Sequence, residues 1–88
     1  MSELNKQILE KLFPGEPPLY DDYTTSMDAA FYVLQKLHSQ GWFWRLDSVH
    51  DGVICTVQNL KRKTYSIGAK TAPLAICECA VKTLEEPA

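Results

Sequence analysis

The sequence has few of the residues that build catalytic, metal and disulfide sites. It holds two histidines, His38 and His50, and three cysteines, Cys55, Cys77 and Cys79. An odd number of cysteines, two of them two positions apart, does not make a disulfide framework, and these spacings do not match those of metal ligands. The four glycines are scattered, so there is no glycine-rich phosphate loop. We therefore expect no enzyme, no metal and no cofactor.

An excess of basic residues and a long apolar run are also missing. Nine Lys and Arg residues against eleven Asp and Glu residues give a formal net charge of -2, which argues against general binding to nucleic acid. The start of the chain has no signal-peptide pattern, and no apolar run approaches the roughly 20 residues that span a bilayer. Free thiols are typical of a reducing compartment. We expect a soluble, cytoplasmic protein that does not contact a membrane.

The 88 residues, 45% of them hydrophobic, suffice for one small globular domain. Apolar residues at helical spacing predict a helix within residues 1–13, which Pro14 and Gly15 end. Residues 14–23 form a proline-rich linker, and residues 24–88 form the domain proper. Whether the first helix packs on this domain or on a partner stays open.

Three short strands are predicted in the middle of the chain. Alternating residues mark Trp42–Leu46, Val53–Val57 and Thr64–Ile67, and the Asp51-Gly52 pair predicts a tight hairpin between the first two. A helix precedes them, with Thr24, Thr25 or Ser26 as its cap. A second helix follows, with Pro73 in its first turn.

The fold class that follows is α+β, in the order α-α-β-β-β-α. A three-stranded antiparallel meander has helices packed on it. If the helices that begin near Ser26 and Ala72 cover one sheet face, the domain has two layers. If the first helix covers the other face, it is an α/β/α sandwich. Both alternatives stay open, because Trp42–Leu46 carries aromatic residues on both sides.

Two groups of side chains are candidates for binding. Aromatic residues and arginine are enriched at the centres of protein interfaces, although rings are also common in a core. The candidate partner-binding residues are Phe43, Trp44, Arg45, Tyr65, Tyr20 and Tyr23. The candidate anion-binding or nucleic-acid-binding residues are Lys61, Arg62, Lys63 and Lys70, with Arg45 close by.

The basic group supports an alternative function. The order α-β-β-β-α is also that of double-stranded-RNA-binding domains, which use a basic N-terminal end of their last helix to reach phosphates. Here that end carries a single cation, Lys70. The similarity is therefore one of topology, and a topology does not by itself carry a function.

The segments Tyr23–Ala30, Gly41-Trp42 and Ala69–Cys77, together with Leu34 and Leu37, resemble a family of small phage and prophage proteins, the phage ABA sandwich domain. The run Thr-Ala-Pro-Leu-Ala-Ile-Cys is its most distinctive part, and the similarity covers Tyr23 to Leu84. The resemblance implies an α/β sandwich in a protein made in an infected or lysogenic bacterium. It carries over no activity and no functional residue.

Together these observations predict a non-enzymatic phage accessory protein that binds a host or phage protein. A host defence system such as CRISPR–Cas is a candidate target, which would make the protein anti-CRISPR-like. A domain this small leaves apolar surface that a symmetric partner could cover, so a homodimer is also expected.

Overall fold

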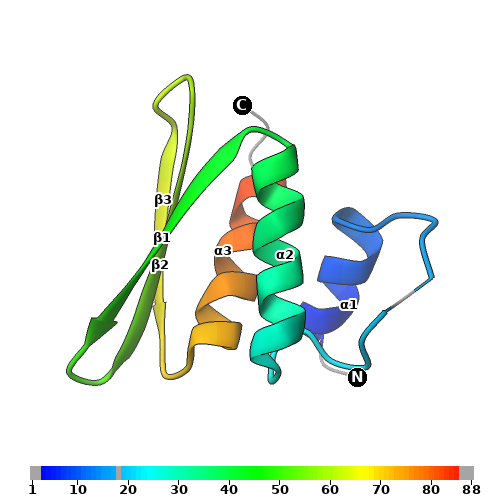
Figure 1. The fold of residues 1–88 in the computed structure, drawn as a ribbon, viewed down its shortest axis with the longest axis horizontal. Coiled ribbons are helices and arrows are strands. Elements are labelled where there is room, and N and C mark those ends of the chain that lie inside the picture. Colours follow the sequence, from blue (N-terminus) through cyan, green and yellow to red (C-terminus); the bar gives the residue numbers. More distant parts are fainter. Residues whose placement is uncertain (1–2, 18, 86–88) are drawn as a thin grey trace.

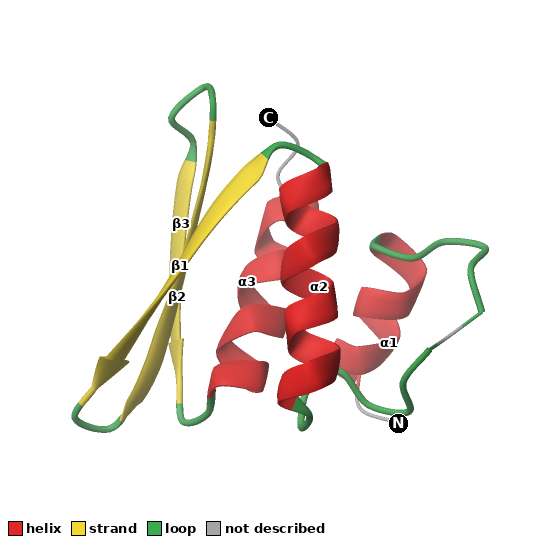
Figure 2. Ribbon diagram, viewed as in Figure 1, coloured by secondary structure: helices red, strands yellow, loops and turns green. Residues whose placement is uncertain are grey.

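The computed structural model describes residues 3–17 and 19–85. Its elements follow the predicted order (Figures 1 and 2): α1 Glu3–Lys11, α2 Met27–Ser39, β1 Trp42–Val49, β2 Gly52–Asn59, β3 Thr64–Ala69 and α3 Ala72–Glu85. The strands form one antiparallel sheet in the order β1-β2-β3. The predicted α+β fold with a meander is therefore confirmed.

Each strand extends further than its alternating apolar residues indicated. β1 runs on to Val49, because only His50 and Asp51 lie in the first turn and Val49 pairs directly with Gly52. β2 runs on to Asn59, whose Oδ1 accepts the backbone N–H groups of Lys61 and Lys63, each at 3.0 Å. Backbone pairing thus continues past the alternating apolar residues, so the alternation of side chains does not mark where a strand ends.

Local residues define both ends of α2, and of the three predicted caps the structure uses Ser26. Ser26 is the N-cap, and its Oγ accepts the backbone N–H of Ala29 at 3.3 Å. After α2, Gly41 adopts a φ of 96°, a left-handed conformation that glycine tolerates, and β1 starts at the next residue. Ser2, a residue type that favours the N-cap position and precedes the first helix in sequence, lies outside the described residues.

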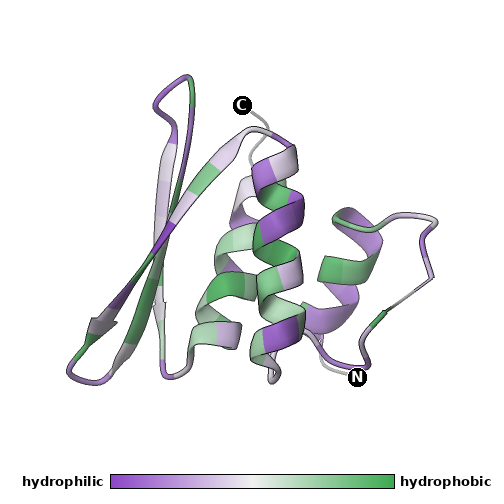
Figure 3. Cartoon of the chain, in the orientation of Figure 1, coloured by the Kyte–Doolittle hydropathy of each residue, from purple (hydrophilic) through white to green (hydrophobic). Residues whose placement is uncertain are grey.

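Helix α3 is the central element, because it contacts α1, α2, β2 and β3. Most of its residues are buried, among them Ala75, Ile76 and Ala80, and the small side chains let the sheet and the other helices approach closely. Figure 3 shows the hydrophobic residues gathered on α2 and α3, whereas the hairpin loops are mostly hydrophilic. The core therefore extends from the space between the sheet and the helices into the contact between α1, α2 and α3.

Helix α1 packs against α3, on the side of the helix layer away from the sheet (Figure 1). Its Asn5 is fully buried, donates to the carbonyl of Asp21 at 3.2 Å and accepts the backbone N–H of Tyr23 at 2.7 Å. The α/β/α arrangement that the sequence left open, with this helix on the second sheet face, is not found. Among the described residues, all helices lie on one side of the sheet.

Candidate protein-binding surface

The second face of the sheet is exposed, and the pairing of the strands decides which residues it carries. Cys55 and Val57 on the central strand are fully buried against the helices, so their neighbours in sequence point to the other side. We call this side the outer face. Its cross-strand rows are Phe43–Gln58–Thr64, Arg45–Thr56–Ser66, Asp47–Ile54–Gly68 and Val49–Gly52.

Polar contacts organise the middle of the outer face. Arg45 Nε donates to Asp47 Oδ2 at 2.9 Å, with 72% and 44% of the two side chains exposed. Beside this ion pair, the hydroxyls of Thr56 and Ser66 lie 3.0 Å apart. An exposed ion pair stabilises the fold little and is readily exchanged for contacts with a partner. Arg45 is therefore available for recognition.

A shallow hollow of ≈ 320 Å³ lies next to Arg45. Phe43, whose side chain is 52% exposed, provides its aromatic wall, and the polar side chains come from the central and third strands. The lining residues are Phe43, Trp44, Arg45, Thr56, Gln58 and Thr64. An apolar ring surrounded by hydrogen-bonding groups is the composition of a protein contact site.

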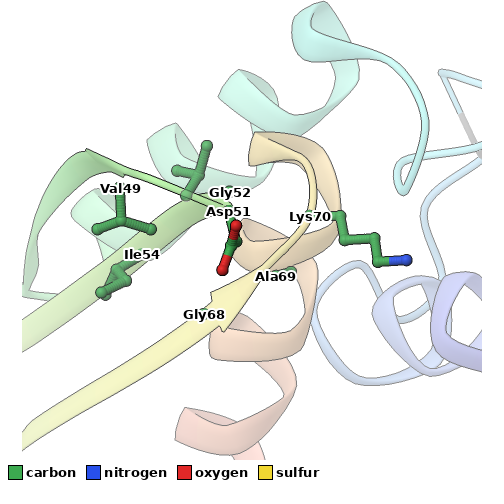
Figure 4. Close-up of a pocket in the computed structure, with 8 residues that line it drawn as sticks. Val49, Asp51, Gly52, Ile54, Gly68, Ala69 and Lys70 are labelled. Atoms are coloured by element: carbon green, nitrogen blue, oxygen red, sulfur yellow. The ribbon is translucent and has the colours of Figure 1, made fainter.

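A second hollow, of ≈ 420 Å³, lies at the end of the sheet near the β1–β2 turn. Figure 4 shows Val49 and Ile54 side by side there, whereas the Lys70 side chain extends away from them. Gly68 leaves room beside Ile54 because it has no side chain. This hollow is more apolar than the first, so it offers surface area but few groups that would orient a ligand.

The predicted partner-binding residues do not form one surface. Phe43 and Arg45 lie on the outer face, but Trp44 lies on the helix side, where its ring centroid is 6.3 Å from that of Phe31. Tyr65 is half-buried beside Trp42, at 5.9 Å between ring centroids. The binding role of these residues stays a prediction.

Two tyrosines of the same group lie on the far side of the helix layer. Tyr23 is 1% exposed and stacks on Phe13, and burial raises the pKa of its hydroxyl. Tyr20 is half-buried against Tyr23 and Tyr32. The two rings thus pack the segment before α2 against Phe13, which follows α1, and against Tyr32 of α2.

The predicted basic group is divided as well. Lys61, Arg62 and Lys63, which we call the basic hairpin, are exposed in the turn between β2 and β3. Lys70 follows the other end of β3, so the length of this strand separates it from the basic hairpin (Figure 1). A single phosphate cannot contact both, and a nucleic-acid site would have to extend along the sheet.

Sequence reasoning missed part of this surface. Apolar residues at helical spacing favour a buried position for Phe31 and Met27 in α2, but they are 40% and 38% exposed, and Phe31 lies beside Trp44 of β1. The buried side of α2 is instead centred on Ala30, Val33 and Leu37. Helical spacing identifies the apolar stripe of a helix, but it does not show how much of that stripe the sheet covers. Thr56, Gln58 and Thr64 gave no signal because they are ordinary strand residues.

The cysteines make the contacts of buried core residues. Cys77 Sγ contacts the carbonyl of Tyr23 at 3.1 Å, whereas Cys79 Sγ faces the sheet, 3.5 Å from the carbonyl of Cys55. Burial raises the pKa of Cys77 to about 12, and the hydrogen bond with Cys79 together with burial raises that of Cys55. These two thiols stay protonated near neutral pH, a state unsuited to nucleophilic attack.

Residues 3–17 and 19–85 contain no group of three His, Cys, Asp or Glu side chains that could hold a metal ion. Within the same residues, no helix has the length and apolar character needed to cross a bilayer.

The chain was compared with known proteins. The family model described as Phage ABA sandwich domain matches residues 18–81. Because the match spans more than half of the chain, the chain belongs to this family, and the resemblance seen in the sequence is confirmed. No curated protein and no solved structure matches it.

Proposed function

We propose that this member of the phage ABA sandwich domain family is a phage accessory protein that acts by binding another protein and catalyses no reaction. The observation that carries the proposal is the bare outer face, where Phe43 and Arg45 flank a hollow of ≈ 320 Å³. Their chemistry suits the centre of an interface, since aromatic rings and guanidinium groups contribute much of the binding free energy there.

The partner that we propose is a protein of the bacterial host, with a CRISPR–Cas component as the first candidate. Family membership supports a phage setting, in which a small binding protein can block a defence complex without any chemistry of its own. The net charge of -2 supports a protein partner over a nucleic acid.

The experiment has two parts. First, the tagged chain is mixed with bacterial host lysate, and retained proteins are identified for the wild type and for a Phe43→Ala/Arg45→Ala variant. The matched control is Leu19→Ala/Lys11→Ala, which removes another exposed apolar group and a cation away from the sheet. A host protein retained by the wild type and the control, but lost with the outer-face variant, is expected. If no protein shows this pattern, binding through the outer face is wrong.

Second, plaque formation by a CRISPR-targeted phage is counted on cells that express each variant. We expect the wild type and the control to raise the plaque count, and the outer-face variant to leave it near the level without the protein. A specific partner together with an unchanged plaque count would retain protein binding and refute the defence target.

A further inference from the structure

Strand β1 is an edge strand that the fold leaves unprotected. All of Trp42–Val49 pairs in register with β2, without a bulge, and the strand contains neither proline nor lysine. No strand of the described residues pairs with its other side. Proteins normally protect such an edge, because a long regular strand with free backbone groups binds another strand. The β1 edge is therefore open to pairing with another strand.

The hydrogen bonds identify the backbone groups that this edge offers. The N–H of Asn59 donates to the carbonyl of Lys63 at 3.0 Å, so odd-numbered residues of β2 face β3 and even-numbered ones face β1. The β1 residues that pair with these even-numbered β2 residues are odd-numbered. The N–H and C=O groups of the even-numbered residues Trp44, Leu46 and Ser48 therefore point away from β2, toward the open edge. The carbonyl of Trp42 also points this way, and His38 Nδ1 lies 3.3 Å from it.

A second copy of the chain could pair with this edge in two registers, and charge distinguishes them. Suppose that two β1 strands pair in antiparallel fashion about a two-fold axis. Seven residues of each strand then stay paired if the axis passes at Arg45 or at Leu46, and fewer stay paired in any other register. With the axis at Arg45, this arginine faces its own counterpart and Phe43 faces an aspartate. With the axis at Leu46, Arg45 faces Asp47 of the second copy twice. Like charges directly opposite destabilise a ladder and opposite charges stabilise it, so charge selects Leu46.

The apolar side chains favour the same register. It places Phe43, which is 52% exposed, opposite Val49 of the second copy, which is 43% exposed. On the helix side, exposed Phe31 and Trp44 contact each other beside the same edge. Most of the exposed large apolar residues thus lie on β1 or next to it.

We propose that two copies of this chain join β1 to β1 in antiparallel fashion about a two-fold axis at Leu46, which makes one continuous six-stranded sheet. The pairing is symmetric, so it closes with two copies and uses up both β1 edges. The outer faces of the two copies then lie side by side and stay exposed. The dimer therefore does not depend on the binding of a host protein.

The first test measures mass by light scattering over a range of concentrations. We expect twice the 10.0 kDa of one chain. Ser48→Pro removes an outward N–H without touching the pairing with β2, and should raise the dissociation constant of the dimer about tenfold or more. Ser66→Pro, whose N–H points out from the other sheet edge, is the matched control and should leave the dimer intact. A mass of one chain for the wild type at every concentration would overturn the proposal.

The second test examines the register. Arg45→Asp places acid against acid across the axis and Asp47→Arg places base against base, so each variant alone should dissociate about tenfold or more readily. Mixing the two variants should restore the dimer, because the aspartate introduced in one chain then faces the arginine introduced in the other. The ion pair within each chain stays broken in this mixture, so the restored dimer would report the contact between chains. If either variant dimerises like the wild type, or if the mixture of two folded monomers stays monomeric, the Leu46 register is wrong.

Discussion

The hydrogen bonds of Asn5 make the strongest prediction about stability. This side chain is fully buried and joins α1 to the segment before α2, through the carbonyl of Asp21 at 3.2 Å and the N–H of Tyr23 at 2.7 Å. Asn5→Ala removes both bonds and leaves the N–H of Tyr23 without this acceptor inside the core.

The expected magnitude follows from these contacts. Each neutral hydrogen bond contributes about 1 kcal/mol, and a buried donor left unpaired costs about 1–3 kcal/mol. The free energy of unfolding should therefore fall by about 2–4 kcal/mol, a large part of the roughly 5–15 kcal/mol of a typical domain. For a chain of this size the corresponding fall in Tm is about 10 °C or more.

Urea denaturation followed by circular dichroism measures this change, with hydrogen exchange of the Tyr23 amide as a local readout. The matched control is Asn59→Ala, because Asn59 Oδ1 also accepts two backbone N–H groups, but these groups are exposed. Water can replace Asn59, so its loss should cost about 1 kcal/mol or less. If Asn5→Ala costs no more than Asn59→Ala, the reasoning that this contact holds α1 in place is refuted.

Other predictions concern the sheet, the acid range and the basic hairpin. A Cβ at Gly52 would clash with the carbonyl oxygen of Ala69, so Gly52→Ala should destabilise by about 1–3 kcal/mol in thermal melts, whereas Gly68→Ala, with its nearest contact at 3.6 Å, should cost less. Hydrogen bonds from the side chain and backbone of Thr24 lower the pKa of Asp22, so their stabilisation is present above about pH 4 and is lost as the pH falls further. Asp22→Asn should therefore weaken the dependence of Tm on pH below about pH 4, and an unchanged profile would contradict this origin. Replacing the basic hairpin with alanines should abolish any salt-dependent gel shift with duplex RNA, and a wild type that gives no shift at low salt would remove the nucleic-acid alternative.

The arrangement of the elements could be predicted because its causes are local. The capping hydroxyl of Ser26, the left-handed Gly41, the two-residue turn His50-Asp51 and Pro73 in the first turn of α3 each act within a few residues. The strand ends could not be placed as well, since the ladder at Val49 and Asn59 depends on partners in other strands.

The candidate site was predicted only in part, because neighbours in sequence do not share a surface in this fold. Phe43 and Trp44 are adjacent, but the pleat sends them to opposite sides of the sheet. Tyr20 and Tyr23 were predicted as recognition residues, and the structure places Tyr23 against Phe13 and Tyr20 against Tyr32 of α2. Only the tertiary structure could separate exposed rings from packed ones.

The sequence by itself determined the order of helices and strands and the family, since both depend on short-range patterns of apolar, capping and turn residues. The tertiary structure decided that α1 packs on α3, which leaves the outer face and the β1 edge free for other molecules. The physical reason is long-range complementarity. Asn5 finds its partners 16 and 18 residues away, in a segment that no local pattern of α1 identifies.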